Sequence, residues 1–288
     1  MNLFSISEAH YYCSHFAATT GDSEGSIDAF RQGRLGNGPL TLREGTTDFQ
    51  EFQDCSLRDV ERSLFLSAGQ YRRSLDLMIR SASPWAHVTL YYGSYYAARA
   101  LLGMFGSVIF KGKFVIDVGK GAAGSQELRF RRIGNSSPAH ERSRYGGSHE
   151  RFWDLFYKAI SSLRPFTAVN LAAALSPVSG NPVWQTEKRN EVNYDPVAGL
   201  NLAILFGATF TTNAFRSSLP GVLGTQFHIV EALLTLAYDF AGRFGLQTDA
   251  LDRLGAVGVL RDKVRMLIYD ERAPGLGRQT RSIKLVVT

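Results

Sequence analysis

Two consecutive helical segments constrain the fold of this chain most. Between residues 56 and 80 apolar side chains recur at the spacing of one helix face, and Ser56 is the expected N-cap. Ser83 followed by Pro84 opens a second segment, residues 83–106, with the same spacing. Long helices joined by a short connection typically pack antiparallel. The sequence therefore predicts a mainly α fold built on a helical bundle.

The hydrophobic period changes after residue 106. Residues 107–110 and 114–118 indicate a β-hairpin, and residues 127–133 alternate apolar and charged side chains as a third strand would. On that strand we expect Leu128, Phe130 and Arg132 to share one side. These segments predict a small β insertion at about 106–146. Further helices are expected at about 148–163, 197 to about 215, 226–244 and 248–269, and a final strand at 283–287.

The first 55 residues differ from the rest. After a short helix expected at 5–16, residues 20–47 are polar and glycine-rich, without clear periodicity. We therefore expect residues 1–55 to form an N-terminal accessory region and residues 56–288 to form one helical domain with the β insertion. No apolar run has the length of a membrane span, the chain starts without a basic secretion signal, and only two cysteines are present. A cytoplasmic protein that contacts no membrane is expected.

Positive charge gathers in two segments of a chain whose net charge is +6. Residues 120–151 and residues 261–288 each carry seven Lys or Arg against three acidic residues. Two basic segments on a near-neutral body suit a polyanionic partner such as RNA. Solvated loops and a basic tail would give the same composition, so both interpretations stay open here.

Residues 188–196 bring ionisable and amide side chains together in what we expect to be one turn. Asp195 and Pro196 have the pattern of an N-cap and a first helical residue. Arg189, Asn190 and Asn193 would then lie just ahead of a helix N-terminus, where backbone N–H groups favour a bound anion. The cluster fits either phosphate binding or a cap network that ties a loop to a helix.

Two features together resemble the HEPN superfamily of helical nucleotide-binding and RNase proteins. The helix PWAHVTLYYGSYYAARALLGMFG is similar to the family's helix rich in tyrosine and small residues, and Arg189-Asn190 matches the start of the family's Arg…His motif. The resemblance covers about residues 56–106 and 148–245. Tyr194 stands at the place of the motif histidine, and no histidine follows at 195 or 196.

The resemblance implies a homodimer that cleaves RNA without metal or cofactor, as the effector of a toxin or phage-defence system. By position, Arg189 would bind the scissile phosphate, Asn190 would orient Arg189 or contact the substrate, and Tyr194 would take the histidine's place. Further RNA contacts are expected from Lys188, Asn193, Arg129, Arg131 and Arg132, with Phe130 or Tyr145 stacking on an unpaired base.

The tyrosine at position 194 leaves other functions open. Tyrosine is a poor general base at neutral pH, whereas histidine suits proton transfer there. A substitute histidine would have to come from His87, His140, His149 or His228. The alternative is a catalytically inactive HEPN-like scaffold or sensor that binds a protein partner, such as an antitoxin, or a nucleotide.

Overall fold

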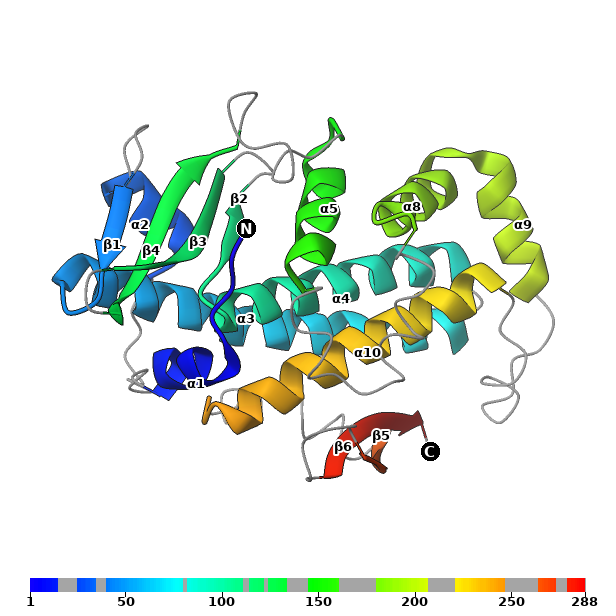
Figure 1. Cartoon of the computed structure of the whole chain (residues 1–288). Coiled ribbons are helices and arrows are strands. Elements are labelled where there is room, and N and C mark those ends of the chain that lie inside the picture. Colours follow the sequence, from blue (N-terminus) through cyan, green and yellow to red (C-terminus); the bar gives the residue numbers. More distant parts are fainter. Residues whose placement is uncertain are drawn as a thin grey trace. The chain divides into compact units, whose positions relative to one another are not determined.

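The computed structural model describes residues 1–14, 25–34, 40–79, 82–110, 114–121, 124–133, 145–160, 180–206, 221–246, 264–272 and 279–287. It is mostly helical with a small four-stranded antiparallel sheet, as the sequence predicts (Figure 1). The chain divides into two compact units. Unit 1 comprises residues 1–63, 98–163 and 240–248, and unit 2 comprises residues 64–97, 164–239 and 249–288.

The sheet of unit 1 has the strand order β1-β4-β3-β2. The strands are β1 (Leu40–Arg43), β2 (Val108–Phe110), β3 (Phe114–Lys120) and β4 (Gln126–Arg132). All three predicted strands of the insertion are therefore confirmed. Strands β3 and β4 pair antiparallel along their whole length, from Phe114↔Arg132 to Lys120↔Gln126.

Strand β1 was not predicted. It pairs with β4 through the partners Leu40↔Phe130 and Leu42↔Leu128, and the Leu42 side chain is buried. Four residues are too few for an alternating pattern to stand out, and the flanking residues are polar. Residues 40–43 thus supply an edge strand to a sheet whose other strands follow far later in the sequence.

The helices of unit 1 cover an aromatic core. They are α1 (Ile6–Ser14), α2 (Ile27–Arg34), α5 (Ser148–Ile160), the first part of α3 (Thr47–Ile79) and the last part of α4 (Ser83–Met104). Edge-to-face ring pairs such as Phe30–Phe52 and Phe105–Phe240 fill this core. Helix α3 begins nine residues before the expected Ser56, since the Thr46 hydroxyl accepts from the Phe49 N–H and caps it.

Unit 2 contains the rest of α3 and α4 together with α8 (Trp184–Tyr194), α9 (Pro196–Phe206) and most of α10 (Gly221–Arg243). Its apolar core joins α3, α4 and α10 and comprises Tyr71, Leu75, Met78, Ala86, Leu90, Phe227, Val230 and Leu234. Gly93 of α4 lies close to α3. Its carbonyl accepts from the Ser67 hydroxyl of α3 at 2.7 Å.

Two expectations in unit 2 were wrong. Residues 188–194 belong to α8 rather than to a turn, because the run from Gln185 to Val192 is rich in good helix formers. Residues 264–269, expected in a helix, lie in β5 (Val264–Arg272), which pairs with β6 (Gln279–Val287). Strand pairing outweighs weak helical spacing there. The remaining residues expected in that helix, 248–263, lie outside the described residues.

None of the described helices combines the length and the apolar composition that a membrane crossing requires.

Candidate functional site

Arg189 lies in the middle of α8, partly buried against α4. The Cζ atom of its guanidinium lies 4.8 Å from the centroid of the Tyr91 ring. Tyr91 is fully buried, and its hydroxyl lies 3.4 Å from Oγ1 of Thr186 on α8. A guanidinium this close to an aromatic face is attracted by the ring quadrupole. Tyr91 is therefore the support on which the Arg189 side chain rests.

Asn190 fixes the other side of the same guanidinium. Its Oδ1 accepts from both Nε and Nη2 of Arg189, the first at 3.1 Å. Nη1 of Arg189 and Nδ2 of Asn190 have no hydrogen-bond partner in the part of the chain that the structure describes. The expected orienting contact between Asn190 and Arg189 is present, and it leaves adjacent donors on both side chains.

The two carboxylates nearest to Arg189 in sequence are engaged elsewhere. Glu187 accepts from Nδ2 of Asn181 at 2.6 Å, and Glu191 forms an ion pair with Lys188 at 2.5 Å. Among the described residues Arg189 has no ion pair at all. A partly buried guanidinium without a carboxylate partner suits an external anion. Lys188, for which an RNA contact is predicted, forms its ion pair with Glu191.

The helical repeat separates Tyr194 from Arg189. Residues four apart share a helix face, so Asn193 lies one turn beyond Arg189, and Tyr194 lies one turn beyond Asn190. Five residues turn Tyr194 about 140° around the axis from Arg189. Asn193 and Tyr194 are both exposed. The structure therefore keeps Arg189 and Asn190 in contact but places Tyr194 on a different face from Arg189.

The start of α9 is capped as the sequence predicts. The Asp195 carboxylate accepts from the Val197 N–H at 2.9 Å, and Pro196 is the first helical residue. Arg189 and Asn190 precede this helix start in sequence, but they lie within α8 rather than in the turn expected there, so neither stands directly ahead of the α9 N-terminus. The carboxylate of Asp195 already occupies the end of α9, so Arg189, rather than a helix terminus, is the group available to an anion.

His87 is a histidine whose pKa is affected by charged residues of α8. It is fully buried on α4, and neither ring nitrogen has a hydrogen-bond partner within the described residues. Burial lowers the pKa of His87 to about 4, opposed by the charge of Glu191 and assisted by that of Lys188. His87 is therefore neutral at pH 7 but closed off from solvent.

The other candidate histidines offer less. His228 is exposed on α10, and Glu231, three residues later on the same helix, accepts from the Tyr71 hydroxyl at 2.7 Å. His149 lies in α5 of unit 1, whereas Arg189 lies in unit 2. His140 lies outside the described residues. Within the described ranges, no three His, Cys, Asp or Glu side chains form a group that could hold a metal ion.

A buried hydrogen-bond network that joins α4, α8 and α10 was not predicted from the sequence. Nε2 of Gln226 on α10 donates to Oγ of Ser94 on α4 at 3.0 Å and to Oε1 of Gln185 on α8 at 2.8 Å. Gln185 lies one turn before Arg189, and Ser94 lies one turn after Tyr91. A sequence signal for this network was available, because its polar residues stand among the apolar residues of the buried helix faces. The network ties together the helices that carry Arg189 and its support.

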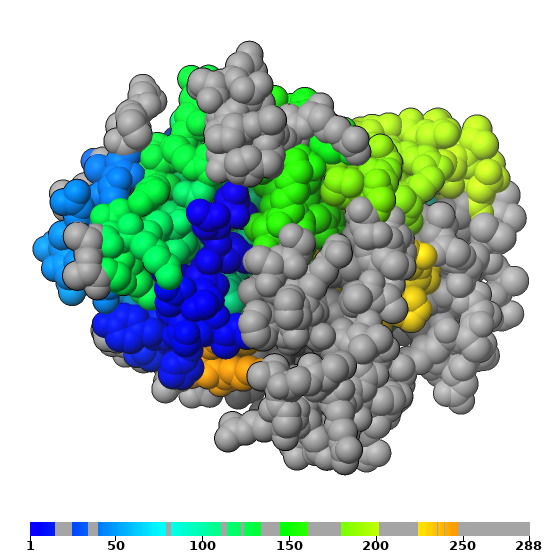
Figure 2. Space-filling view, viewed as in Figure 1, coloured from blue at the N-terminus to red at the C-terminus, as the bar shows by residue number. Residues whose placement is uncertain are grey.

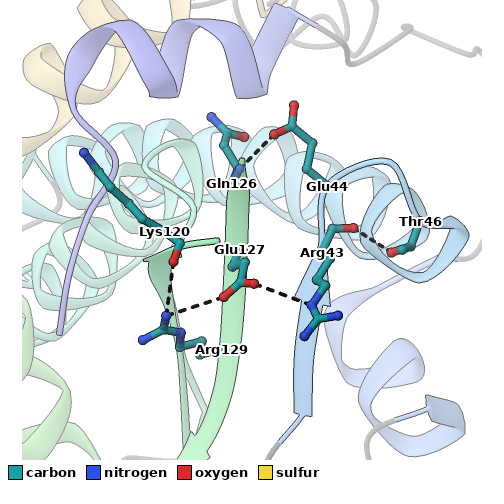
Figure 3. Close-up of polar contacts among 7 residues, drawn as sticks. All are labelled: Arg43, Glu44, Thr46, Lys120, Gln126, Glu127 and Arg129. Carbon is teal, nitrogen blue, oxygen red and sulfur yellow. Dashed lines mark hydrogen bonds and ion pairs between the residues drawn. The ribbon is translucent and has the colours of Figure 1, made fainter. Parts of the chain in front are cut away.

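The predicted RNA contacts on β4 lie in unit 1. The first of them, Arg129, donates to the Lys120 carbonyl and pairs with Glu127 (Figure 3). Glu127 forms ion pairs with Arg43 of β1 at 3.5 Å and with Arg129 at 3.4 Å. A Cβ atom at Gly119 would lie 2.5 Å from Nε of Arg129, so the Arg129 side chain lies directly against the backbone of β3. Arg43 and Arg129 are both more than half exposed and share a single carboxylate.

The next two arginines of β4 are more firmly engaged. Arg131 forms an ion pair with Asp117, which is 4% exposed, and Arg132 lies 5.9 Å from the Phe114 ring centroid. Phe130 is buried and stacks on Phe114, with ring centroids 5.6 Å apart. The expected shared side of Leu128 and Phe130 is confirmed, but stacking of Phe130 on a base is excluded.

Comparison of this chain with family models, with curated proteins and with solved structures gave no match. The function therefore has to be argued from the chemistry of the site. That chemistry is a supported guanidinium with free donors, at the surface of a helical unit.

Proposed function

We propose that this chain is a HEPN-like RNA-binding protein in which Arg189 and Asn190 bind an RNA phosphate. One observation carries the proposal: Arg189 is partly buried, held by Tyr91 and Asn190, and without an ion pair among the described residues. The planar guanidinium presents several donors in a geometry that matches phosphate oxygens. The neighbouring amide of Asn190 adds a donor to the same anion.

Metal-independent RNA cleavage is the activity we propose for this site, in a cytoplasmic homodimer that acts in a toxin or phage-defence system. The 2′-oxygen of the substrate would bond to the adjacent phosphorus while the bond from phosphorus to the 5′-oxygen breaks. Arg189 would stabilise the charge that develops on the phosphate oxygens. A proton has to leave the 2′-hydroxyl, and another has to reach the 5′-oxygen.

A second candidate is RNA binding without cleavage, in a scaffold or sensor. The observation that favours it is that no imidazole shares the helix face of Arg189, since Asn193 occupies the position one turn away. His87 is neutral but buried, and Tyr194 lies on another face. In this case another protein would bind the RNA-bound form of this chain.

A paired binding and cleavage experiment separates these candidates. Labelled RNA is incubated in EDTA with wild type, Arg189→Ala and Arg189→Lys, and binding is followed by fluorescence anisotropy. Lys188→Ala is the matched control, because Lys188 neighbours Arg189 but is paired with Glu191. Binding lost in Arg189→Ala and kept in Lys188→Ala supports the proposal, and products with 2′,3′-cyclic phosphate ends establish cleavage. RNA binding that is indifferent to Arg189 refutes it.

A further inference from the structure

Tyr194 presents an aromatic ring to solvent. Its side chain is 74% exposed, and it has no hydrogen bond or ring contact among the described residues. Tyrosine usually buries its ring and leaves only the hydroxyl in water. A ring this exposed at the end of α8 is available to an external partner.

The ring lies next to the donors of the proposed phosphate site. Tyr194 and Asn190 are four residues apart on α8 and share one face, about 6 Å apart along the axis. Asn190 in turn holds the Arg189 guanidinium. That separation is of the same order as the distance from a phosphate to the base of its own nucleotide.

The adjoining surface of α9 is also apolar. Val197 is 63% exposed and Leu200 is 58% exposed, and their spacing of three residues places them on one face of α9. Helices α8 and α9 meet at a corner in Figure 1 and contribute to the molecular surface in Figure 2. The negative charge of Asp195 between them is engaged by the Val197 N–H. A flat apolar group can therefore lie against this surface, one helical turn beyond Asn190, which holds the Arg189 guanidinium.

We propose that Tyr194 stacks on an unpaired base of the RNA whose phosphate Arg189 binds, so that the site takes single-stranded RNA. The inference rests on the proposed function and assigns Tyr194 to substrate selection rather than to the place of a catalytic histidine. Bases of single strands are free to stack on aromatic side chains, whereas those of a duplex already stack on one another. Charge complementarity at Arg189 and an uncovered ring at Tyr194 are both met by a single nucleotide.

The test compares three forms of one short RNA sequence by fluorescence anisotropy. They are the single strand, the same strand in a duplex, and the single strand with abasic riboses that keep the phosphates. The variants are Tyr194→Ser, Tyr194→Phe and Arg189→Ala. Trp85→Ser is the matched control, because Trp85 on α4 is also an exposed aromatic residue, at 62%. Thermal melting followed by circular dichroism checks that each variant is folded.

We expect Tyr194→Ser to bind the single strand about tenfold more weakly than wild type, the loss of one stacked base. Tyr194→Phe and Trp85→Ser should bind as wild type does, and the affinity for duplex should not depend on Tyr194. Wild type and Tyr194→Ser should bind the abasic strand equally, because no base remains to stack.

The outcomes separate this inference from the proposed function. Equal binding of single strand and duplex by wild type, or unchanged single-strand binding by Tyr194→Ser, overturns the role of Tyr194. If Arg189→Ala still loses binding, the proposed phosphate site stands without it. Absence of RNA binding by folded wild type, or binding independent of Arg189, overturns both.

Discussion

Acidification should destabilise this protein through His87. Its imidazole is fully buried without a hydrogen-bond partner in the described part of the chain, so protonation places an unpaired charge between α4 and α8. The nearest compensating charge is Glu191, which Lys188 already engages. Burial therefore dominates and lowers the pKa of His87 to about 4 in the folded chain.

The sign and size of the effect follow from proton linkage. An unfolded histidine has a pKa of about 6.5, so between about pH 6.5 and 4 the unfolded chain binds the extra proton. The contribution of neutral His87 is complete above that window and is lost as the pH falls through it. The difference between the two pKa values corresponds to about 3 kcal/mol of unfolding free energy at full loss.

Urea unfolding followed by circular dichroism, in steps from pH 7 to pH 4, measures this loss. His87→Leu is the comparison, because it removes the titration while every other group titrates alike in both proteins. The unfolding free energy of wild type should fall relative to that of His87→Leu by about 1.4 kcal/mol per pH unit within the window. Parallel pH profiles for the two proteins would refute the reasoning.

Three further substitutions test packing, pairing and capping through the free energy of urea unfolding. Gly103→Ala should cost about 1–3 kcal/mol, because its Cβ would lie 2.5 Å from Cγ2 of Val60, and an unchanged stability would contradict this overlap. Arg131→Ala should cost about 2 kcal/mol by leaving the nearly buried carboxylate of Asp117 without its ion pair, and adding Asp117→Asn should recover part of it. Asp195→Ala should cost about 1 kcal/mol through the lost N-cap, whereas Asp195→Asn should cost little.

The parts of the fold that were predictable carry long periodic signals. Helices α3, α4 and α10 span several turns, so single polar residues do not obscure their apolar faces. The hairpin of β2 and β3 was predictable because its strands are adjacent in sequence. Helix α8 was missed because its apolar residues are few, and its polar cluster resembled a turn. The helix that Asp195 caps was predicted from that cap, from Pro196 and from the apolar residues that follow.

Only those contacts of the candidate site that join sequence neighbours were predictable. Arg189 and Asn190 are neighbours in sequence, so their pairing needed no knowledge of the fold. The contact between the Arg189 guanidinium and the Tyr91 ring joins residues that are far apart in sequence, so no local sequence pattern predicts it. The position of Tyr194 relative to Arg189 could not be predicted, because residues 188–194 were expected in a turn and lie in a helix.

The pairing of β1 with β4 has a consequence for how the protein is made. Residues 40–43 leave the ribosome long before residues 126–132, so β1 has no partner during much of synthesis. Closure of that sheet edge has to wait for α3, α4 and the β2–β3 hairpin to emerge. Sheets closed by distant segments form slowly, and from the emergence of β4 until it pairs with β1, the β4 edge with Leu128 and Phe130 can pair with another nascent copy.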